Sequence, residues 1–140
     1  MDKKFKIIAE YIKDMSSETP NIETFLYVKD KILKYNLGIE INSTPLKNNM
    51  IEVNTKLIFQ DPENSQKKSH FELIYSSLIK LEENIDDKKM IEKIILCDVQ
   101  NEIYPNLEKV FLDMVRNSGY KNIRIDKKID FNKLYLSRTN

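Results

Sequence analysis

Two stretches in the first half of the chain, residues 33–41 and 51–59, alternate between apolar and polar positions. A repeat of two residues is typical of a β-strand that buries one face and exposes the other. Residues 42–50 between them are rich in Asn, Ser and Pro, which favour turns, so the two strands should form an antiparallel hairpin. The apolar face of this hairpin needs a covering layer. Its alternating positions are Leu33, Tyr35, Leu37, Ile39 and Ile41, followed by Ile51, Val53, Thr55, Leu57 and Phe59.

Two more stretches, residues 5–15 and 71–81, alternate less strictly because apolar residues interrupt the polar series. We expect both to be strands that a neighbouring element or another subunit partly covers on the second face. Residues 16–21 with Pro20 predict a break, and 22–30 predicts either a short helical turn or an irregular crossover. The expected inward positions of the first strand are Phe5, Ile7, Ala9, Tyr11 and Met15, and the interrupting residues are Ile8, Ile12, Ile74 and Leu78.

The period of the pattern changes in the second half of the chain. Apolar residues recur at spacings of three and four from about residue 87 to 117, which predicts a long amphipathic helix. Gly119 is placed to end this helix, and Pro105 should kink or split it. A short final helix over 129–136 should begin with Asp130 as its cap. The long helix is the layer that the sheet requires.

Length and composition predict one domain over residues 1–140, of the α+β class. We expect a four-stranded antiparallel sheet, covered on one face by the long C-terminal helix, plus the short final helix. With 23 basic and 22 acidic side chains the chain has no overall field that would gather nucleic acid or an anionic membrane. It contains neither an apolar run long enough for a membrane span nor a signal-peptide pattern at its start, so we expect a cytoplasmic protein without membrane insertion.

Residues with catalytic or metal-binding chemistry are sparse. His70 is the single histidine and has Glu72 two positions on, but a site needs several converging ligands. Cys97 has no cysteine partner and lies within the helical apolar pattern, where a thiol is typically a small core residue. A chain with two glycines cannot form a glycine-rich phosphate loop. We therefore expect no catalytic residue, no metal and no cofactor.

Aromatic residues gather in the 22–30 segment and in the helical C-terminal half. Each of them is a candidate for core or oligomer packing, because aromatic side chains are often buried. Together they also suit an apolar groove, since rings give a large contact area at a low entropic cost. The residues are Phe25, Tyr27, Tyr104, Phe111, Tyr120, Phe131 and Tyr135.

Three motifs resemble the SecB family of bacterial export chaperones in both order and spacing. Residues 11–21 read Tyr-Ile-Lys-Asp-Met-Ser-Ser-Glu-Thr-Pro-Asn, 101–105 read Asn-Glu-Ile-Tyr-Pro, and 129–135 read Ile-Asp-Phe-Asn-Lys-Leu-Tyr. They match the family's first strand, the Asn-x-Leu-Phe-Pro of its long helix and its C-terminal Val-Asn-Phe-x-x-Leu-aromatic. The chain departs from the family at 76–77, where Ser-Ser stands for Gly-Gly, and at 99–100, where Val-Gln stands for Cys-Pro.

The resemblance implies a homotetramer, built as a dimer of dimers, that holds unfolded preproteins in long apolar grooves without ATP and passes them to the export motor SecA. Two alternatives stay open: a SecB-like chaperone dedicated to one partner, such as a toxin–antitoxin system, and, more distantly, a hotdog-type enzyme, whose helix however lies between strands. Carried over by motif, the groove residues are Phe25, Leu26, Tyr27, Tyr104, Phe111, Tyr120, Phe131 and Tyr135, and the SecA contacts are Asp14, Glu18 and Glu72.

Overall fold

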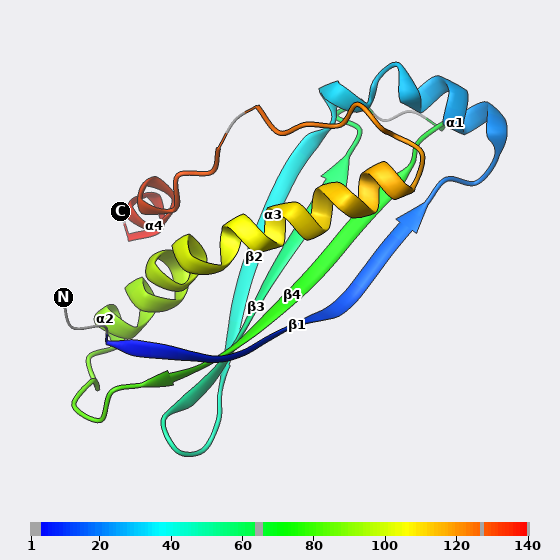
Figure 1. Ribbon diagram of the computed structural model, residues 1–140. Helices are drawn as coiled ribbons and strands as arrows, with labels where there is room; N and C mark the ends of the chain where they lie inside the picture. The colour runs from blue at the N-terminus through cyan, green and yellow to red at the C-terminus, as the bar shows by residue number, and fades with distance from the viewer. Residues whose placement is uncertain (1–3, 64–65, 127, 140) are drawn as a thin grey trace.

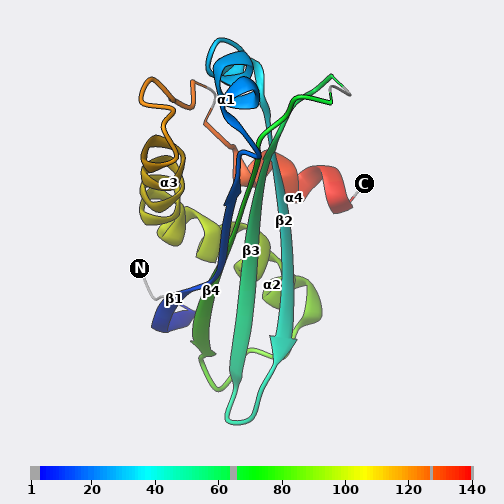
Figure 2. The same ribbon diagram turned by 90° about the vertical axis from the view of Figure 1, so that its right-hand side faces the viewer.

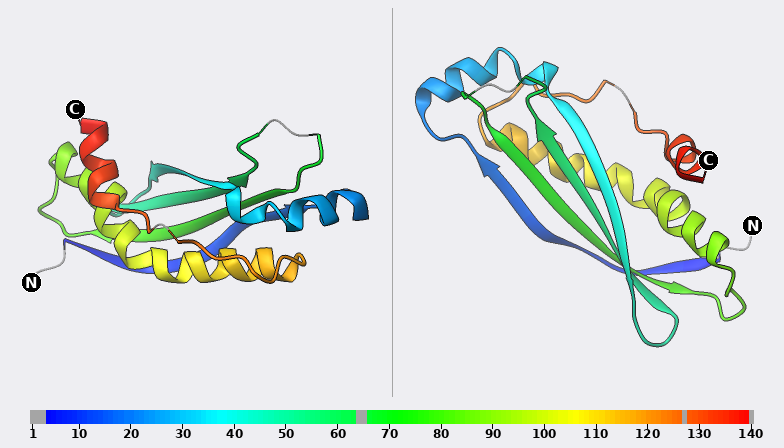
Figure 3. Two further views of the ribbon diagram at one scale, coloured as in Figure 1. Left: turned by 90° about the horizontal axis from the view of Figure 1, so that it is seen from above. Right: turned by 180° about the vertical axis from the view of Figure 1, so that it is seen from behind.

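The computed structural model describes residues 4–63, 66–126 and 128–139, which form two layers, a sheet and a long helical segment (Figures 1 and 3). The four antiparallel strands are arranged in the order β1-β4-β3-β2, so β1 and β2 are the two edges. The α+β prediction is confirmed. The elements are β1 Phe5–Glu18, α1 Ile22–Lys29, β2 Asn36–Pro45, β3 Met50–Gln60, β4 His70–Leu81, α2 Lys88–Lys93, α3 Val99–Asn117 and α4 Phe131–Thr139.

The β2–β3 hairpin is confirmed, but β2 begins later than the sequence predicted. Residues Ile32–Lys34 form a 3-10 turn, and pairing with β3 starts at Asn36. Ile32 and Tyr35, three positions apart, are buried, whereas Leu33 is 51% exposed. The period of two that included Leu33 and Tyr35 was therefore coincidental, because the inward residues here follow a helical spacing of three. Residues 22–29 form the helix α1. Of the two alternatives for this segment, a short helical turn or an irregular crossover, the helical one is therefore correct.

The first strand is longer than predicted and its alternation is broken twice. β1 continues through residues 16–18, where a break was expected, and its register against β4 shifts between Ile7 and Ala9 and between Ile12 and Asp14. Each bulge inserts one residue and reverses which side of the sheet the following residues face. Ile12 accordingly pairs with Tyr75 on the helix side, while Tyr11 pairs with Ser76 on the opposite side. The expected inward positions of Ala9, which pairs with Leu78, and of Tyr11 were wrong for this reason.

The long helix runs over residues 88–117 without a break at Pro105, so the helix is not split there as the sequence had allowed. The irregularity lies earlier, where Ile94–Asp98 form a π-helical turn between α2 and α3. Pro105 is exposed, so water can replace the hydrogen bond that the proline removes. Gln100 stabilises the π-turn because its Nε2 donates to the carbonyl oxygen of Ile95 at 3.1 Å and its Oε1 accepts from the Thr55 hydroxyl at 2.9 Å.

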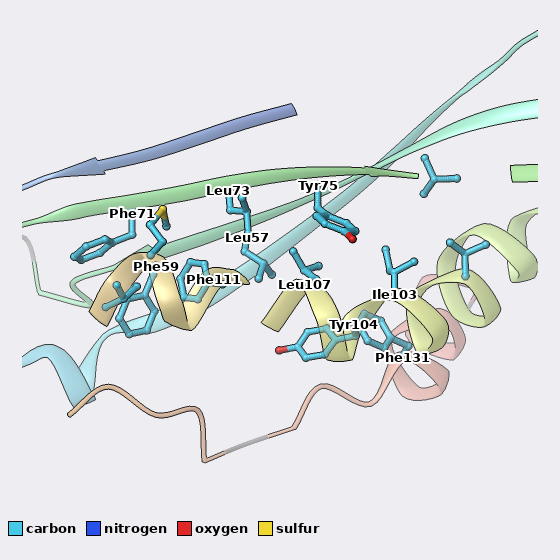
Figure 4. Packing of buried hydrophobic residues seen from close by; sticks show 14 of the residues in the cluster. Leu57, Phe59, Phe71, Leu73, Tyr75, Ile103, Tyr104, Leu107, Phe111 and Phe131 are labelled. Carbon is cyan, nitrogen blue, oxygen red and sulfur yellow. The ribbon is translucent and has the colours of Figure 1, made fainter. Parts of the chain in front are cut away.

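The core lies between α3 and the strands (Figure 4). Phe111 is fully buried and its ring meets that of Phe59 edge-on at a centroid distance of 5.7 Å. Leu107, also fully buried, points at the sheet from the preceding turn of the helix. Cys97 is buried, as the sequence predicted. Burying side chains of this size contributes roughly 1.5–3 kcal/mol each, which makes this layer contact the main source of stability.

One corner of the molecule joins four segments through Tyr120, which is 2% exposed. The Tyr120 hydroxyl lies 2.7 Å from the Ser69 hydroxyl and 3.1 Å from that of Thr19, and its ring packs on Phe25 of α1. Gly119 precedes it with φ of 108°, a backbone conformation that glycine adopts without strain. The prediction that Gly119 ends the helix is confirmed, since α3 stops at Asn117.

Candidate functional site

The long helix crosses the sheet obliquely and leaves the edge strand β2 only partly covered (Figure 2). The helix-side residues Leu37, Ile39 and Ile41 of β2 are half-buried, whereas the corresponding residues of β3, such as Leu57, are fully buried. Apolar side chains at the edge of the core therefore remain open to contact. We call this strip along the helix side of β2, together with the segments facing it, the β2 groove.

Three cavities follow the β2 groove from the start of β2 to its end. The first, of about 510 Å³, lies between Leu37 and the irregular segment that contains Ile125. The second, of about 480 Å³, lies between Ile39 and Leu134 of α4. The third, of about 250 Å³, lies between Ile41 and the end of the helical run around Ile91. Leu37 borders the first two cavities, so they are neighbours along the strand.

A fourth cavity of about 320 Å³ lies on the other side of the segment before α4. Tyr104 and Phe131 line it, together with Pro105 and Ile129. The Tyr104 and Phe131 rings meet edge-to-face with centroids 5.4 Å apart, on the side of α3 away from the strands (Figure 4). Burial, with Glu108 nearby, raises the pKa of Tyr104, so its hydroxyl stays neutral. The charged residues in the cavity lining are Glu108 and Lys128.

Helix α4 is held against the π-turn by its first residues. Asp130 Oδ1 accepts from the backbone N–H of Lys133 at 3.1 Å, which confirms Asp130 as the predicted cap. The Cys97 thiol donates to Oδ1 of Asn132, and the Asn101 side chain contacts the same sulfur. These contacts fix the beginning of α4. They thereby position Leu134, which lines the second cavity, and Phe131, which lines the fourth.

The structure divides the eight predicted groove residues into three groups. Phe111 and Tyr120 are 0% and 2% exposed, so the alternative of core packing describes them. Tyr104 and Phe131, which are 9% and 2% exposed, are also buried and pack on each other beside the fourth cavity, and Tyr135, half-buried, follows on α4.

The remaining three predicted groove residues lie on α1, at the opposite end of the molecule from α4 (Figure 1). Phe25 is half-buried against Tyr120, and Leu26 is 52% exposed. The Tyr27 ring lies 5.0 Å from the ammonium group of Lys31, a cation–π contact. The α1 residues therefore form an aromatic surface of their own and do not meet Tyr104 and Phe131.

The predicted SecA-contact residues lie on the outer face, which we define as the sheet side formed by the even-numbered residues of β2, β3 and β4 and their partners on β1. Asp14 pairs with Ile74, Glu18 pairs with His70, and Glu72 lies between them on β4. Asp14 and Glu18 are exposed. The polar placement that the alternation predicted for these three carboxylates is confirmed; their role stays a prediction.

Two lysines form ion pairs with carboxylates on the outer face, one of which is the predicted contact residue Glu72. Lys13 Nζ lies 2.6 Å from Glu52 Oε1, and Lys56 Nζ lies 3.1 Å from Glu72 Oε1. The hydrogen bond from Lys56, assisted by His70 at 3.1 Å, lowers the pKa of Glu72. The hydrogen bond from Lys13 likewise lowers the pKa of Glu52. His70 thus belongs to a surface hydrogen-bonded pair with Glu72, and the described residues contain no cluster that could hold a metal ion.

The other edge of the sheet, β1, exposes large apolar side chains on both faces. Ile8, Tyr11, Ile12 and Met15 are 44–51% exposed. Single exposed apolar residues are ordinary, but four within eight positions of one free strand edge mark a contact surface. In the described part of the chain, none of the helices has the length and apolar character needed to cross a membrane.

Sequence reasoning missed the β2 groove. The alternation identified Leu37, Ile39 and Ile41 as inward residues but assigned the whole helix to cover them. How much of an edge strand a helix covers depends on its crossing angle, which periodicity does not contain. The isoleucines at 125 and 129 carried a weak signal, since an irregular segment rarely repeats apolar residues unless it packs against something.

Comparison with known proteins agrees with this architecture. The SecB family model, preprotein translocase subunit SecB, matches residues 1–140. The chain is 54% identical over 140 residues to the putative protein-export protein SecB of Pelagibacter ubique (strain HTCC1062), covering 100% of both chains. It is 29% identical over 131 residues to the protein-export protein SecB of Methylocella silvestris, covering 94% of this chain and 80% of the relative.

A solved structure shows the same fold at low sequence identity. The SecB-like chaperone of Mycobacterium tuberculosis, in complex with an antitoxin peptide, superposes with a TM-score of 0.64 at 12% identity, covering 89% of this chain and 91% of that one. A likeness at this identity concerns the fold alone. The family match over the whole length, together with the close relative, decides the assignment: the chain belongs to the SecB family of protein-export chaperones.

Proposed function

We propose that this protein binds unfolded segments of secretory precursors in the β2 groove and delivers them to the export motor SecA. The observation that carries the proposal is the series of three cavities along the half-buried Leu37, Ile39 and Ile41. Exposed apolar strips of this kind are typical of protein-binding surfaces. The names of the SecB relatives, protein-export proteins, support the same role.

Holding requires no chemical step. A protein that binds only the unfolded state lowers the concentration of free unfolded chain by mass action, and so slows both folding and aggregation. Apolar side chains of the client leave water on entering the cavities, which supplies roughly 25 cal/mol per Å² of buried apolar surface. Tyr104 and Phe131 line the fourth cavity from buried positions. They remain proposed client contacts together with Phe25, Leu26, Tyr27 and Tyr135, whereas Phe111 and Tyr120 support the surface from the core.

A refolding assay tests the holding activity. A stoichiometric amount of the protein should delay refolding of a slow-folding precursor in the absence of nucleotide. Leu134→Asp places a charge in the second cavity and should shorten the delay, whereas Leu136→Asp on the same helix, 57% exposed and outside the four cavities, should not. An absent delay, or one that requires ATP, would refute the proposal.

Delivery to SecA is a separate part of the proposal and concerns the outer face. Asp14 and Glu18 present exposed carboxylates there, and Glu72 lies beside them, with Glu40 and Glu52 on the neighbouring strands. We expect the double variant Asp14→Arg, Glu18→Arg to lose binding in a titration against SecA, because opposite charges across an interface set its recognition.

A control with the same change of charge separates this role from a general effect. Glu23→Arg with Asp30→Arg, on exposed positions of α1 and at its end, should leave SecA binding intact. Wild-type protein that does not bind SecA would instead favour a chaperone dedicated to one partner.

We also propose assembly into a homotetramer built as a dimer of dimers. The free edge of β1 supports it, since Ile8, Tyr11, Ile12 and Met15 would leave water if a second copy packed there. Solution mass should be about four times 16.6 kDa. Tyr11→Glu with Met15→Glu should lower the mass, and a monomeric wild type would contradict the proposal.

A further inference from the structure

The single histidine of the chain lies on the outer face, beside two of the three carboxylates proposed to contact SecA. His70 is the first residue of β4, and its partner in the ladder with β1 is Glu18. Side chains at directly opposite positions on one face of a sheet have Cβ atoms about 4.5–5.5 Å apart. The His70 imidazole and the Glu18 carboxylate are therefore neighbours at this end of the sheet.

Glu72 connects His70 to a second cation. His70 Nε2 lies 3.1 Å from Glu72 Oε2, and Lys56 Nζ lies 3.1 Å from Glu72 Oε1. The Glu72 carboxylate is ionised at neutral pH because the hydrogen bond from Lys56 lowers its pKa, and an ionised carboxylate only accepts hydrogen bonds. Nε2 of His70 therefore carries a hydrogen in this contact, which leaves Nδ1 as the nitrogen that takes up the next proton.

The His70 imidazole is open both to solvent and to a docked protein. Its side chain is 45% exposed, and that of Glu72 is 22% exposed. Glu18, on the adjacent strand, is exposed as well. A proton reaches His70 without any opening of the fold, and a protein bound to the outer face at Glu18 and Glu72 would lie against the same imidazole.

Charged side chains surround His70 on several elements. As a residue type, histidine changes its charge between about pH 5 and about pH 8, whereas carboxylates and ammonium groups ordinarily keep theirs over most of this range. The charge of this part of the outer face therefore follows the pH through His70. The charged residues of the neighbouring elements are Asp14 and Glu18 on β1, Glu40 on β2, Lys56 on β3, Asp61 and Glu63 after β3, Lys67 and Lys68 before β4, and Glu72 on β4.

We infer that protonation of His70 weakens the docking of SecA on the outer face, so that delivery of a client depends on pH. The inference rests on the proposed function and adds regulation to the same surface. With a neutral imidazole, Glu18 and Glu72 present negative charge to basic groups of the partner. An imidazolium places one positive charge next to both carboxylates and offsets part of that attraction.

The size of the effect follows from the exposure of the site. A unit charge about 4–5 Å from a basic group of the partner, in water, changes an affinity by roughly fivefold at most, and salt reduces this further. Linkage makes the effect reciprocal, since a partner that binds the protonated form more weakly must lower the proton affinity of His70 by the same factor. Docking at acidic pH should therefore release protons.

Calorimetric titration against SecA in low salt, at about pH 6 and at about pH 8, tests the inference. His70→Gln stays neutral and can still donate a hydrogen bond to Glu72, whereas His70→Arg keeps a positive charge at both pH values. The pH dependence of His70→Gln corrects for groups that titrate on SecA itself. Lys109→Gln, at an exposed position of α3 away from the outer face, is the control for a general change of charge. Circular dichroism and solution mass confirm that each variant is folded and assembled like the wild type.

We expect the Kd of the wild type to rise roughly two- to fivefold more than that of His70→Gln when the pH falls from about 8 to about 6. Lys109→Gln should behave like the wild type, and His70→Arg should bind weakly at both pH values. In buffers of different ionisation enthalpy, the wild type should release more protons on binding at about pH 6 than His70→Gln does.

Two results would overturn the inference in distinguishable ways. An equal pH dependence of Kd in the wild type and in His70→Gln removes the role of His70 and leaves delivery to SecA intact. A wild-type protein that binds SecA at neither pH contradicts delivery to SecA, and the regulation of docking with it.

Discussion

Replacing the buried pair Thr55 and Gln100 tests whether the sheet fixes the π-turn through this hydrogen bond. Both residues are 0% exposed, and the Thr55 hydroxyl donates to Gln100 Oε1 at 2.9 Å. Thr55→Val removes the donor and leaves the amide oxygen buried without it, which should cost about 1–3 kcal/mol of the free energy of unfolding. Gln100→Leu leaves the threonine hydroxyl unpaired and also removes the 3.1 Å contact with the carbonyl of Ile95, so a similar loss is expected.

The double variant distinguishes the pair from two independent sites. With both partners apolar, no unsatisfied side-chain group remains between them, so its total cost should stay near that of one single variant. This corresponds to a coupling energy of about 1–3 kcal/mol. Urea-induced unfolding, followed by circular dichroism at one protein concentration, measures all four proteins. Thr44→Val, at an exposed position of β2, serves as the control and should change stability by less than about 0.5 kcal/mol.

The hypothesis fails if the two single changes simply add. Additivity within about 0.5 kcal/mol would show that Thr55 and Gln100 contribute independently, and that the π-turn does not depend on the sheet. Single variants with almost wild-type stability would show that water reaches the pair and replaces the lost partner. In either case apolar packing, and not this hydrogen bond, would determine where the π-turn forms.

Three other changes should have distinct effects. Gly119→Ala should cost at least about 1 kcal/mol in urea unfolding, because φ is 108° and the new methyl carbon would lie 2.6 Å from the Phe25 ring; wild-type stability would show that the corner is loose. Phe111→Ala should cost about 3–5 kcal/mol by the same assay, whereas Leu46→Ala, 46% exposed, should cost less than about 0.5 kcal/mol. The pKa of Glu72 is lowered from its ordinary 4.5, so its ion pair contributes stability above that pH and loses it as pH falls through the folded-state pKa. Glu72→Gln should therefore lose less stability than wild type between about pH 5 and about pH 3, and parallel pH profiles would refute this.

The sequence was sufficient to predict the layers of the fold because each layer has its own period. Ile51 to Phe59 repeat every second residue, and the helix positions such as Ile103, Leu107 and Phe111 repeat at three and four. Both patterns arise from side chains that face the same core, and the structure buries them there. In β1 the errors arose where one inserted residue changes the phase of the pattern, because a sequence period of two does not reveal where a bulge lies.

The candidate site was predictable only in part. The outer-face position of Glu72 follows from the alternation along β4. Asp14 reaches the expected face because the two bulges in β1 shift the phase twice and so cancel. The aromatic residues could not be divided into core and surface from the sequence, since Phe111 and Tyr104 lie on the same helix but differ in which element covers them. The segment before α4 covers Tyr104, and its path depends on tertiary contacts such as that between Cys97 and Asn132.

The π-turn sets the rotational phase between the two halves of the long helix. One residue more than an α-helical turn requires rotates everything before it by about 100° relative to everything after it. Ile91 and Ile95 can therefore face the end of β2, at the third cavity, while Leu107 and Phe111 face the middle of the sheet. Deleting one residue from Ile94–Asp98 would bring the two halves into a common phase and turn Ile91 away from Ile41. The length of the groove along β2 thus depends on the one extra residue in the π-turn, because this residue orients Ile91 towards the end of the strand.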